Sequence, residues 1–489
     1  MIDSMKRLER TWIFLLKAAL FASVFAIFFL LFSIDNPQIL RPSRTAGVTM
    51  VTFVILEMSL MSVYGGYAIG KQKSKPIVHN LMLATVITDL VTHFQLSIMN
   101  TNQNFNKSFR FANPEILLAC VILQILVIVF FVYAGNDLYF RINPPERCCI
   151  ITTSQYSLNK LTQKLEKYKK QYKITEVLDA GADHLLDAIM RNDTVFIYDV
   201  PIAQRTELVE FCYDHHKNIY YNLELCDVVA LGADSVTLDD KTLISACVKE
   251  LSFEQRIVKR AMDLVLALVA LVLTSPIMIA CAVAVKLGDG GPVFFRQQRA
   301  TKNGKIFKVY KFRTMKVMEE QTVQVSATDN DDRITKVGAV LRKFRVDELP
   351  QIFNILRGEM SIVGPRPEML ENVYRYTEEL PEFEYRLRVK AGLTGLAQVV
   401  GKYNTSPKDK LVLDLIYIEK YSLWMDIKLI FQTLVVFLKS EDSTEGFQEE
   451  NILEFKKHDS DRFSNERSFN GLNPAEQRSC EQGSGDKDC

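Results

Sequence analysis

The chain has 489 residues, which is enough for more than one domain. Its formal net charge of +1 argues against a nucleic-acid partner, because there is no global positive potential. Nine cysteines without a C-x-x-C pair, and six histidines without metal-ligand spacing in the C-terminal half, argue against a disulfide framework and a zinc site. We therefore expect any catalytic metal to be a hard, oxygen-bound ion such as Mg²⁺.

Four apolar runs precede residue 140, and each is close to the roughly 20 residues that cross a bilayer as a helix. They are Trp12–Ile34, Gly47–Ile69, Ile77–Met99 and Ile116–Tyr133. The third is the most polar, and its Asp89 and His93 share a helix face because they are four residues apart. A functional role is one interpretation. We favour a polar pair that faces the bundle interior, because nothing else in the bundle suggests chemistry.

The loops between these runs differ in Lys and Arg content, which sets membrane orientation. Positive residues concentrate before the first run, between the second and third, and after the fourth. They are Lys6, Arg7, Arg10, Lys71, Lys73, Lys75, Arg141 and Arg147. The sequence therefore predicts that the N-terminus and everything after residue 140 lie in the cytoplasm.

Residues 147–250 alternate strand-like and helix-like segments, which predicts a small parallel α/β domain. The expected strands are Cys148–Thr153, Ile174–Leu178, Thr194–Tyr198 and Ile219–Leu223, and the expected helices are Leu158–Tyr172, His184–Arg191 and Gln204–Lys217. The turn at 151–156 has no glycine, so this Rossmann-like domain lacks the dinucleotide fingerprint. A Tyr-x-x-x-Lys pattern occurs at both Tyr156/Lys160 and Tyr213/Lys217, so it is not specific. We interpret the domain as structural or regulatory.

A fifth apolar run, Ala261–Val285, is interrupted by Ser275-Pro276. An interior proline removes a helical hydrogen bond and kinks the helix. Lys and Arg flank the run on both sides, so both ends are predicted to be cytoplasmic. We expect a re-entrant helix over residues 257–287 that breaks at Ser275 and Pro276, with the Ser275 hydroxyl satisfying the freed backbone. A proline-kinked spanning helix is the alternative.

Beyond this helix, Lys302-Asn-Gly-Lys305 predicts a hairpin turn between two strand-like runs. Further on, Asp347 and Glu348 lie among several cations: Arg342, Lys343, Arg345, Arg357 and Arg366. The cations outnumber the acids, and a phosphate-bearing substrate with a divalent metal would account for both. The structural alternative is that Asp347 is a helix N-cap before residues 351–356 and that Glu348 lies in the first turn.

From about Gln255 to Thr444 the chain resembles the bacterial sugar transferase family, the monotopic phosphoglycosyl transferases. With its bundle and α/β domain it is similar to the large members that start exopolysaccharide, capsule or O-antigen units. The matching motifs, in family order, are Lys259-Arg260…Asp263, Ser275-Pro276, Gly291-Pro-Val-Phe-Phe-Arg-Gln297, Tyr310-Lys-Phe-Arg-Thr-Met315, Asp332-Arg-Ile-Thr335, Asp347-Glu-Leu-Pro-Gln351, Gly364-Pro-Arg-Pro-Glu368, Gly392-Leu-Thr-Gly395 and Ser422…Asp426. The chain departs from the family at Thr301, Ala391 and Lys402, where glycine, proline and arginine are frequent.

The resemblance implies a reaction and a role for each matching residue. Asp347 would attack the sugar-bearing phosphorus of a UDP-sugar, expel UMP and carry the sugar phosphate as a covalent ester. Undecaprenyl phosphate would then accept the sugar phosphate. Asp347 and Glu348 would hold Mg²⁺. The residues that bind phosphate would be Lys311, Arg313, Arg342, Arg345 and Arg366.

The resemblance also implies partners and a location. UDP-glucose and UDP-galactose are the first donors to consider, with an N-acetylated sugar as an alternative. The other expected partners are undecaprenyl phosphate and the lipid bilayer, and a homodimer is one option for the oligomeric state. The expected location is the bacterial inner membrane, with the soluble domains facing the cytoplasm.

Other interpretations stay open beside this one. A membrane-bound nucleotide-sugar dehydratase would share the bundle-plus-α/β layout, and a catalytically idle scaffold of a polysaccharide assembly complex would need no site. Arg366 could rigidify a turn, and Arg342, Lys343 and Arg345 could form a solvated or lipid-facing surface. Asp426 could cap a helix over Ile427–Leu438 that lies on the membrane.

The expected fold class is a membrane helical bundle, a Rossmann-like α/β domain and a small α+β catalytic domain with a re-entrant membrane helix. We place the bundle at residues 1–140, the α/β domain at 141–250 and the catalytic domain at 251–445. The remaining residues, 446–489, are polar and predicted to be disordered.

Overall fold

The computed structural model describes residues 9–103, 113–246, 250–316, 333–401 and 405–438. Asp332, Lys402 and the tail at 446–489 lie outside the described residues. Within the described ranges the chain is rich in helices and forms several small sheets. Five of its helices are long and apolar enough to cross a membrane.

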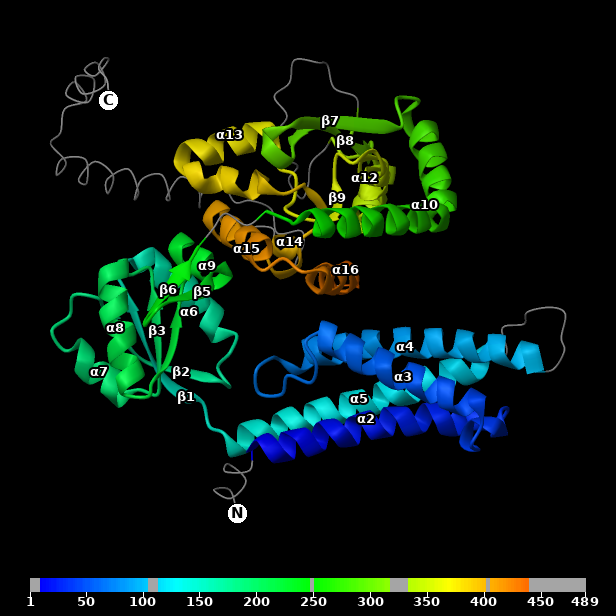
Figure 1. Cartoon of the computed structure of the whole chain (residues 1–489), viewed down its shortest axis with the longest axis horizontal. Coiled ribbons are helices and arrows are strands. Elements are labelled where there is room, and N and C mark those ends of the chain that lie inside the picture. The colour runs from blue at the N-terminus through cyan, green and yellow to red at the C-terminus, as the bar shows by residue number, and fades with distance from the viewer. Residues whose placement is uncertain (1–8, 104–112, 247–249, 317–332, 402–404, 439–489) are drawn as a thin grey trace.

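Four of these helices come first in the chain and pack side by side (Figure 1). They are α2 (Glu9–Ser33), α3 (Arg44–Val63), α4 (Ser74–Gln103) and α5 (Pro114–Ile142), with a short 3-10 helix, η1 (Pro37–Leu40), between the first two. The four predicted apolar runs each coincide with one of these helices. Helix α3 ends earlier than its apolar run because Gly65 and Gly66, at φ angles of 91° and 61°, turn the chain.

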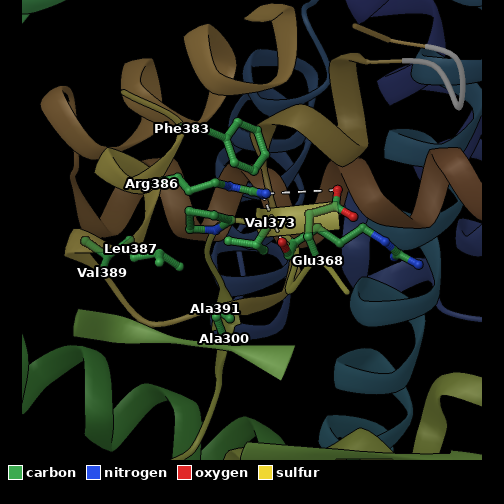
Figure 2. Close-up of a pocket in the computed structure, with 10 residues that line it drawn as sticks. Ala300, Glu368, Val373, Phe383, Arg386, Leu387, Val389 and Ala391 are labelled. Atoms are coloured by element: carbon green, nitrogen blue, oxygen red, sulfur yellow. Dashed lines mark hydrogen bonds and ion pairs between the residues drawn. The ribbon is translucent and has the colours of Figure 1, made fainter. Parts of the chain in front are cut away.

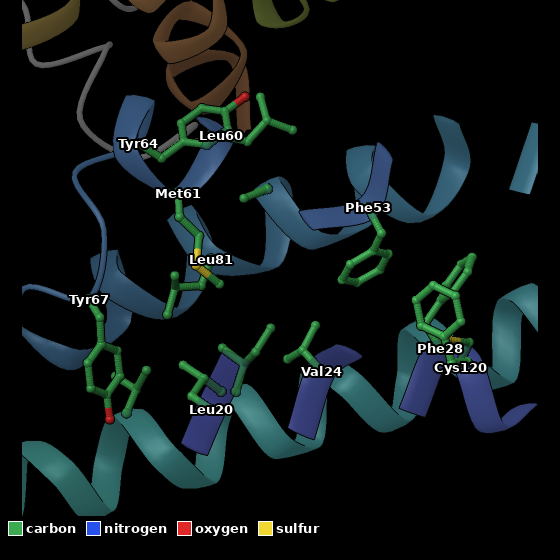
Figure 3. Packing of buried hydrophobic residues seen from close by; sticks show 14 of the residues in the cluster. Leu20, Val24, Phe28, Phe53, Leu60, Met61, Tyr64, Tyr67, Leu81 and Cys120 are labelled. Atoms are coloured by element: carbon green, nitrogen blue, oxygen red, sulfur yellow. The ribbon is translucent and has the colours of Figure 1, made fainter. Parts of the chain in front are cut away.

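Large apolar side chains fill the centre of this bundle (Figure 3). Phe28 of α2 and Phe53 of α3 are fully buried, with ring centroids 5.1 Å apart. Asp89 and His93 of α4 are also buried, with exposed fractions of 0% and 2%. Asp89 accepts a hydrogen bond of 3.4 Å from the amide of Gln124 on α5. The prediction that the polar pair faces the bundle interior is therefore confirmed.

The middle of the chain forms a parallel four-stranded sheet of order β2-β1-β3-β4. The strands are β1 (Glu146–Thr152), β2 (Tyr172–Asp179), β3 (Thr194–Tyr198) and β4 (Asn218–Tyr221), joined by α6 (Gln155–Glu166), α7 (Leu185–Arg191) and α8 (Ile202–Asp214). The predicted alternation of strands and helices is confirmed. Helix α9 (Leu225–Gly232) and an antiparallel hairpin, β5 (Asp234–Leu238) and β6 (Lys241–Ser245), follow.

The last described part combines helices with two short sheets. Its elements are α10 (Phe253–Asp289), β7 (Phe294–Ala300), η2 (Lys302–Gly304), β8 (Ile306–Phe312), α11 (Lys336–Lys343), η3 (Val346–Gln351), α12 (Ile352–Arg357), β9 (Ser361–Val363), α13 (Leu370–Glu379), η4 (Pro381–Arg388), β10 (Gly392–Thr394), α14 (Leu396–Val400), α15 (Pro407–Glu419) and α16 (Leu423–Leu438). Strands β7 and β8 form the predicted hairpin, and Asn303 and Gly304 have the positive φ angles, 57° and 71°, that its turn needs. Strands β9 and β10 pair in parallel.

Helix α10 bends sharply along its length, as Figure 1 shows. Pro276 lies inside it and has no N–H to donate to the carbonyl of Val272. The Ser275 hydroxyl donates to that carbonyl at 2.9 Å and replaces the missing bond. The expected role of Ser275 is therefore confirmed.

Both halves of α10 pack on the same strand. Before the bend, Ala267 is buried in a cluster with Phe307; after it, Val285 is buried in a cluster with Phe312. In a straight helix the two α10 residues would be about 27 Å apart, whereas the two β8 residues are about 17 Å apart along a strand. The bend lets the helix return to the strand.

The apolar side chains on either side of the bend are exposed. Each of the following is at least 50% exposed: Val265, Leu268, Val269, Val272, Leu273, Ile277, Ile279 and Val283. A contiguous apolar surface of this kind indicates contact with lipid or with another apolar surface.

Candidate active site

The paired carboxylates lie on η3, directly after a turn that follows α11. Arg345 occupies the N-cap position of η3 with a φ of 52°, and this left-handed residue redirects the chain. Asp347 and Glu348 therefore fall in the first turn of η3, while Gln351 precedes α12. The interpretation of Asp347 as a helix N-cap is wrong, because neither helix uses it in that position.

Two cations from other elements hold Glu348. Lys311 of β8 places its Nζ 2.7 Å from Oε1 of Glu348, and Arg366, in the turn after β9, places Nη2 3.1 Å from the same oxygen. Burial by itself would raise the pKa of Glu348. The positive charges of Arg366 and Lys311 outweigh that effect and hold the pKa well below its usual range. Glu348 is therefore an ionised carboxylate over the physiological pH range.

Asp347 has a different environment from its neighbour. It is half-buried, and within the described parts of the chain its carboxylate makes no hydrogen bond or ion pair. Burial, followed by the negative charge of Glu348, raises its pKa; the charges of Lys311 and Arg342 oppose the rise without cancelling it. Asp347 is thus a carboxylate with no fixed partner, beside one that is firmly held.

The side chains of the other predicted cations surround the two carboxylates without pairing with them in the described parts of the chain. Arg342 donates from Nε to Oγ1 of Thr314 at 2.9 Å. The side chain of Arg345 acts on Glu348 through its charge, and the carbonyl of Arg345 accepts from the Glu348 N–H at 3.3 Å. Arg313 is 7% exposed and packs against Gly291, where a side chain would collide with its guanidinium. The structure therefore brings Lys311 and Arg366 into contact with Glu348, and keeps Arg313, Arg342 and Arg345 in the surroundings.

Asp426 has a structural position that sequence reasoning did not predict. Ser422, not Asp426, caps α16, because its Oγ accepts a hydrogen bond from the Met425 N–H at 3.1 Å. Asp426 is fully buried and pairs with Lys259 of α10 at 2.6 Å. The interpretation of Asp426 as a simple cap is wrong. The pair joins α10 to α16 beside Val363, whose carbonyl accepts from Lys259 at 3.1 Å.

Two further arginines approach the site and were not predicted as functional. Arg299 of β7 donates to the carbonyl of Pro367 at 3.1 Å. Burial, followed by the charge of Arg366, lowers its pKa to about 10. Arg386 of η4 lines a small pocket with Arg366 and Glu368, where Figure 2 shows it pointing toward Glu368. The sequence of β7, Phe-Phe-Arg-Gln-Gln-Arg-Ala, does not alternate between apolar and polar residues and gives no signal for Arg299, and the 3-10 helix η4 gives none for Arg386.

The donor set suits a hard cation, which is the metal that the sequence predicts. Asp347 offers its carboxylate, and both cations on Glu348 contact Oε1, which leaves Oε2 for a ligand. Two carboxylates are few for a protein-only cage, and the described residues contain no group of three metal-binding side chains. Mg²⁺ commonly uses one or two carboxylates together with substrate phosphates. The site therefore fits a metal that arrives with, or is completed by, a phosphate substrate.

The middle sheet has features that oppose dinucleotide binding. At the carboxyl edge of its strands Asp199, with a φ of 58°, accepts a hydrogen bond of 2.8 Å from the Ser157 hydroxyl in the first turn of α6. An acid therefore occupies the helix end that binds pyrophosphate in nucleotide-binding folds. Lys160 pairs with Asp409 of α15 at 3.6 Å, and Tyr213 is 78% exposed. Neither Tyr-x-x-x-Lys pattern forms a site.

Comparisons with known proteins match the part of the chain that carries this geometry. The family model described as bacterial sugar transferase matches residues 254–440. A UDP-N-acetylgalactosamine-undecaprenyl-phosphate N-acetylgalactosaminephosphotransferase from Aeromonas hydrophila is 45% identical over 184 residues, which are 37% of this chain and 44% of that protein. A UDP-glucose:undecaprenyl-phosphate glucose-1-phosphate transferase from Escherichia coli is 47% identical over 189 residues, 38% of this chain and 41% of that protein.

A third relative extends the similarity toward the N-terminus. A galactosyl transferase from Streptococcus agalactiae is 31% identical over 324 residues, which are 59% of this chain and 71% of that protein. The chain spans only about two fifths of the length of the first two relatives.

Proposed function

Because this chain belongs to the bacterial sugar transferase family, we propose that it transfers a sugar 1-phosphate from a UDP-sugar to undecaprenyl phosphate and releases UMP. The observation that carries the proposal is the contrast between Asp347, which has no fixed partner, and Glu348, which two cations hold. Neighbouring carboxylates in opposite environments are suited to different roles. The names of the relatives support the same class of reaction.

The proposed reaction has two steps at the sugar-bearing phosphorus. In the first, a carboxylate oxygen of Asp347 attacks this phosphorus; the bond to the bridging oxygen breaks, and UMP leaves with that oxygen. In the second, a phosphate oxygen of undecaprenyl phosphate attacks the same phosphorus, and Asp347 is released as a carboxylate. Lys311 and Arg366, which Glu348 holds in place, face the transferred phosphoryl group and bind its oxygens.

The test of this role is Asp347→Asn in the full chain, supplied with UDP-sugar radiolabelled in the sugar. Wild-type protein should form a labelled covalent adduct and release UMP, and the variant should lose both by at least about a hundredfold. Asp240→Asn, an exposed acid in the β5–β6 hairpin, is the matched control. Turnover and adduct retained by Asp347→Asn would exclude Asp347 as the nucleophile.

We propose Asp347 and Glu348 as the protein ligands of Mg²⁺, which would neutralise charge between the attacking carboxylate and the diphosphate. Glu348→Gln keeps the shape of the side chain and removes its charge. The expected result is a weakened dependence of UMP release on Mg²⁺ and weaker Mg²⁺ binding by the substrate-free protein. Unchanged metal dependence and unchanged binding would count against Glu348 as a ligand.

We propose three domains, at 1–140, 141–250 and 251–445, with all soluble parts facing the cytoplasm of the inner membrane. We also propose that α10 is a re-entrant membrane helix. Its bend, its exposed apolar surface and its return to β8 support this topology. A cysteine in place of Asn303, at the exposed tip of the β7–β8 hairpin, should react with an impermeant thiol reagent only after the cells are opened. Labelling from outside intact spheroplasts would show that α10 spans the membrane.

We also propose a homodimer, which mass photometry of the purified protein would test.

We propose UDP-glucose or UDP-galactose as the donor. The names of the relatives include glucose, galactose and N-acetylgalactosamine transferases, so they support a hexose donor without selecting one. Measuring UMP release with each UDP-sugar, including UDP-N-acetylgalactosamine, distinguishes them. The same assay excludes an idle scaffold if UMP forms, and absence of bound NAD after purification would exclude a dehydratase.

A further inference from the structure

The turn that carries Arg366 is fixed by contacts from outside the turn. The Gly364 N–H donates to the carbonyl of Thr394 at 2.8 Å, and the carbonyl of Pro365 accepts from the Gly392 N–H at 2.9 Å. The next carbonyl along the turn, that of Arg366 itself, accepts from Nη2 of Arg386 at 2.9 Å. This last contact differs from the others because it comes from a charged side chain.

Arg386 reaches the turn from a buried ion pair. Its side chain is 3% exposed and lies 2.7 Å from Asp414 of α15, which is 1% exposed. Glu368, at the end of the turn, lies 4.0 Å from Arg386, and Figure 2 shows the two side chains facing one another. Removing two charges from water costs several kcal/mol per ion, so a buried pair is weak support for stability alone.

The guanidinium and the backbone carbonyl of Arg366 therefore belong to one series of contacts. Its guanidinium lies 3.1 Å from Glu348, and its carbonyl is held by Arg386, which Asp414 holds in turn. Phosphoryl transfer depends on placement and charge. A misplacement of about 1 Å can lower such a rate about a hundredfold.

We propose that Arg386 and Asp414 are positioning residues, which fix the backbone of Arg366 so that its guanidinium meets both Glu348 and the transferred phosphoryl group. The proposal rests on the proposed function, because it assigns a purpose to the position of Arg366 in that reaction. Neither residue touches the reacting atoms; both act through Arg366.

The test replaces the ion pair by apolar side chains of similar volume, Arg386→Met together with Asp414→Leu, in the full chain in nanodiscs. Removing both charges leaves neither Arg386 nor Asp414 as an unpaired buried ion, and Glu368 keeps Lys410 at 3.5 Å, so the thermal midpoint should stay within a few degrees of wild type. We expect kcat for UMP release to fall about 10- to 100-fold, with less than a threefold change in KM for the UDP-sugar that the wild-type protein uses. Hydrogen exchange in peptides covering residues 361–370 should accelerate.

Arg388→Met is the matched control. Arg388 lies on the same η4 and pairs with Glu419 of α15 at 3.8 Å, and within the described parts of the chain its side chain makes no hydrogen bond or ion pair with residues 364–368. The Arg388→Met variant should leave kcat and the hydrogen exchange of residues 361–370 unchanged. Nη2 of Arg386 makes both contacts, to Asp414 and to the Arg366 carbonyl. Arg386→Lys keeps the charge but places it on a shorter side chain, one bond short of Nη2, so this variant should keep only part of the wild-type rate.

A stable double variant with wild-type kcat and wild-type exchange would overturn the proposal, as would an equal loss in Arg388→Met. If the double variant fails to fold, the Arg386→Lys variant tests the proposal instead. A wild-type kcat in Arg386→Lys would overturn it. Failure of this proposal can be distinguished from failure of the proposed function. Retained turnover in Asp347→Asn would reject the covalent mechanism, but it would not change the hydrogen-exchange result for residues 361–370.

Discussion

At the scale of single residues, the site depends on the different environments of two adjacent carboxylates, which shift their pKa values in opposite directions. Glu348 shares one carboxylate oxygen between Lys311 and Arg366, whereas Asp347 is left with a raised pKa. A carboxylate attacks phosphorus only when it is ionised. The protonation state of Asp347 should therefore control the rate on the acidic side of the pH profile.

The first prediction concerns that acidic side. Because the pKa of Asp347 is raised by burial and by Glu348, kcat/KM should fall as the pH drops through a value above the usual range for aspartate. Glu348 adds nothing to this fall, since its pKa is held far lower. Lys311→Met removes a charge that lowers the pKa of Asp347, so the fall should move to higher pH.

The control for this prediction is Lys308→Met, an exposed lysine on the same strand, which should leave the profile in place. The measurement is kcat/KM for UMP release between about pH 4 and pH 8. An acidic side that does not move in Lys311→Met, or that moves equally in Lys308→Met, would contradict the assignment of the titrating group to Asp347.

A second residue-scale prediction concerns two departures from the family pattern that contact one another. The hydroxyl of Thr301 accepts from the Ala391 N–H at 3.1 Å and donates to the carbonyl of Glu359 at 3.0 Å. A proline at 391 has no N–H and a glycine at 301 has no hydroxyl, so either change alone breaks the bond. Thr301→Gly should cost about 1–3 kcal/mol because it leaves a buried N–H without its partner.

Ala391→Pro in the Thr301→Gly background removes that orphaned donor. The double variant should therefore be more stable than the sum of the single changes predicts, by about 1 kcal/mol. Thermal unfolding of the four proteins in nanodiscs measures the coupling. Strictly additive losses would show that the two positions are independent.

Sequence reasoning located both carboxylates but not their different environments, for a physical reason. Lys311 and Arg366 come from distant points of the chain, and nothing in the local pattern shows that both reach Glu348 rather than Asp347. The same limit explains Asp426. Its position before an amphipathic helix is typical of a cap, and only the fold shows Lys259 beside it.

At the scale of elements, the long apolar helices and the hairpin follow from local rules. Apolar runs and the Asn303-Gly304 turn identify them without reference to the rest of the chain. Strands β9 and β10 span three residues each, which is too short for a hydrophobic period to show. Their pairing depends on close backbone approach at Gly364 and Gly392.

The third prediction tests how α10 tolerates its bend. Ser275→Ala removes the hydroxyl that satisfies the Val272 carbonyl, and should destabilise the protein by about 1 kcal/mol. Pro276→Ala supplies a backbone N–H for the same carbonyl. Ser275→Ala should therefore have almost no further effect in the Pro276→Ala protein, as measured by thermal unfolding in nanodiscs. An equal loss in both backgrounds would mean that the hydroxyl does not replace the helical bond.

At the scale of the whole molecule, the three regions contact one another through polar side chains, and Val228 of the middle domain is buried in the apolar core of the catalytic region. Gln432 of α16 donates to the carbonyl of Val63 in the bundle at 3.0 Å, and Gln171 of the middle domain donates to the carbonyl of Gly70 at 2.8 Å. Lys408 of α15 pairs with Glu224 of the middle domain at 2.9 Å. None of these contacts has a sequence signal, because each depends on how separately folded regions dock.

The middle domain also packs closely on the catalytic region at Gly232, where α9 meets α15. A Cβ at this position would lie 2.7 Å from the Cβ of Glu419, which is too short for a van der Waals contact. Gly232→Ala should therefore separate the two helices and destabilise the protein by about 1–3 kcal/mol. Gly181→Ala is the control, because a Cβ there would meet only the Asp179 carboxylate at 3.4 Å. It should change stability by no more than about 0.5 kcal/mol.

Separating α9 from α15 should also affect the active site. Helix α15 carries both Glu419, which meets Gly232, and Asp414, which holds Arg386. If docking of the middle domain fixes α15, Gly232→Ala should lower kcat for UMP release and speed proteolysis in the segment before α10, while Gly181→Ala changes neither. Faster proteolysis with wild-type kcat would show that the catalytic region holds α15 by itself. The middle domain would then contribute stability without influencing the position of Arg366.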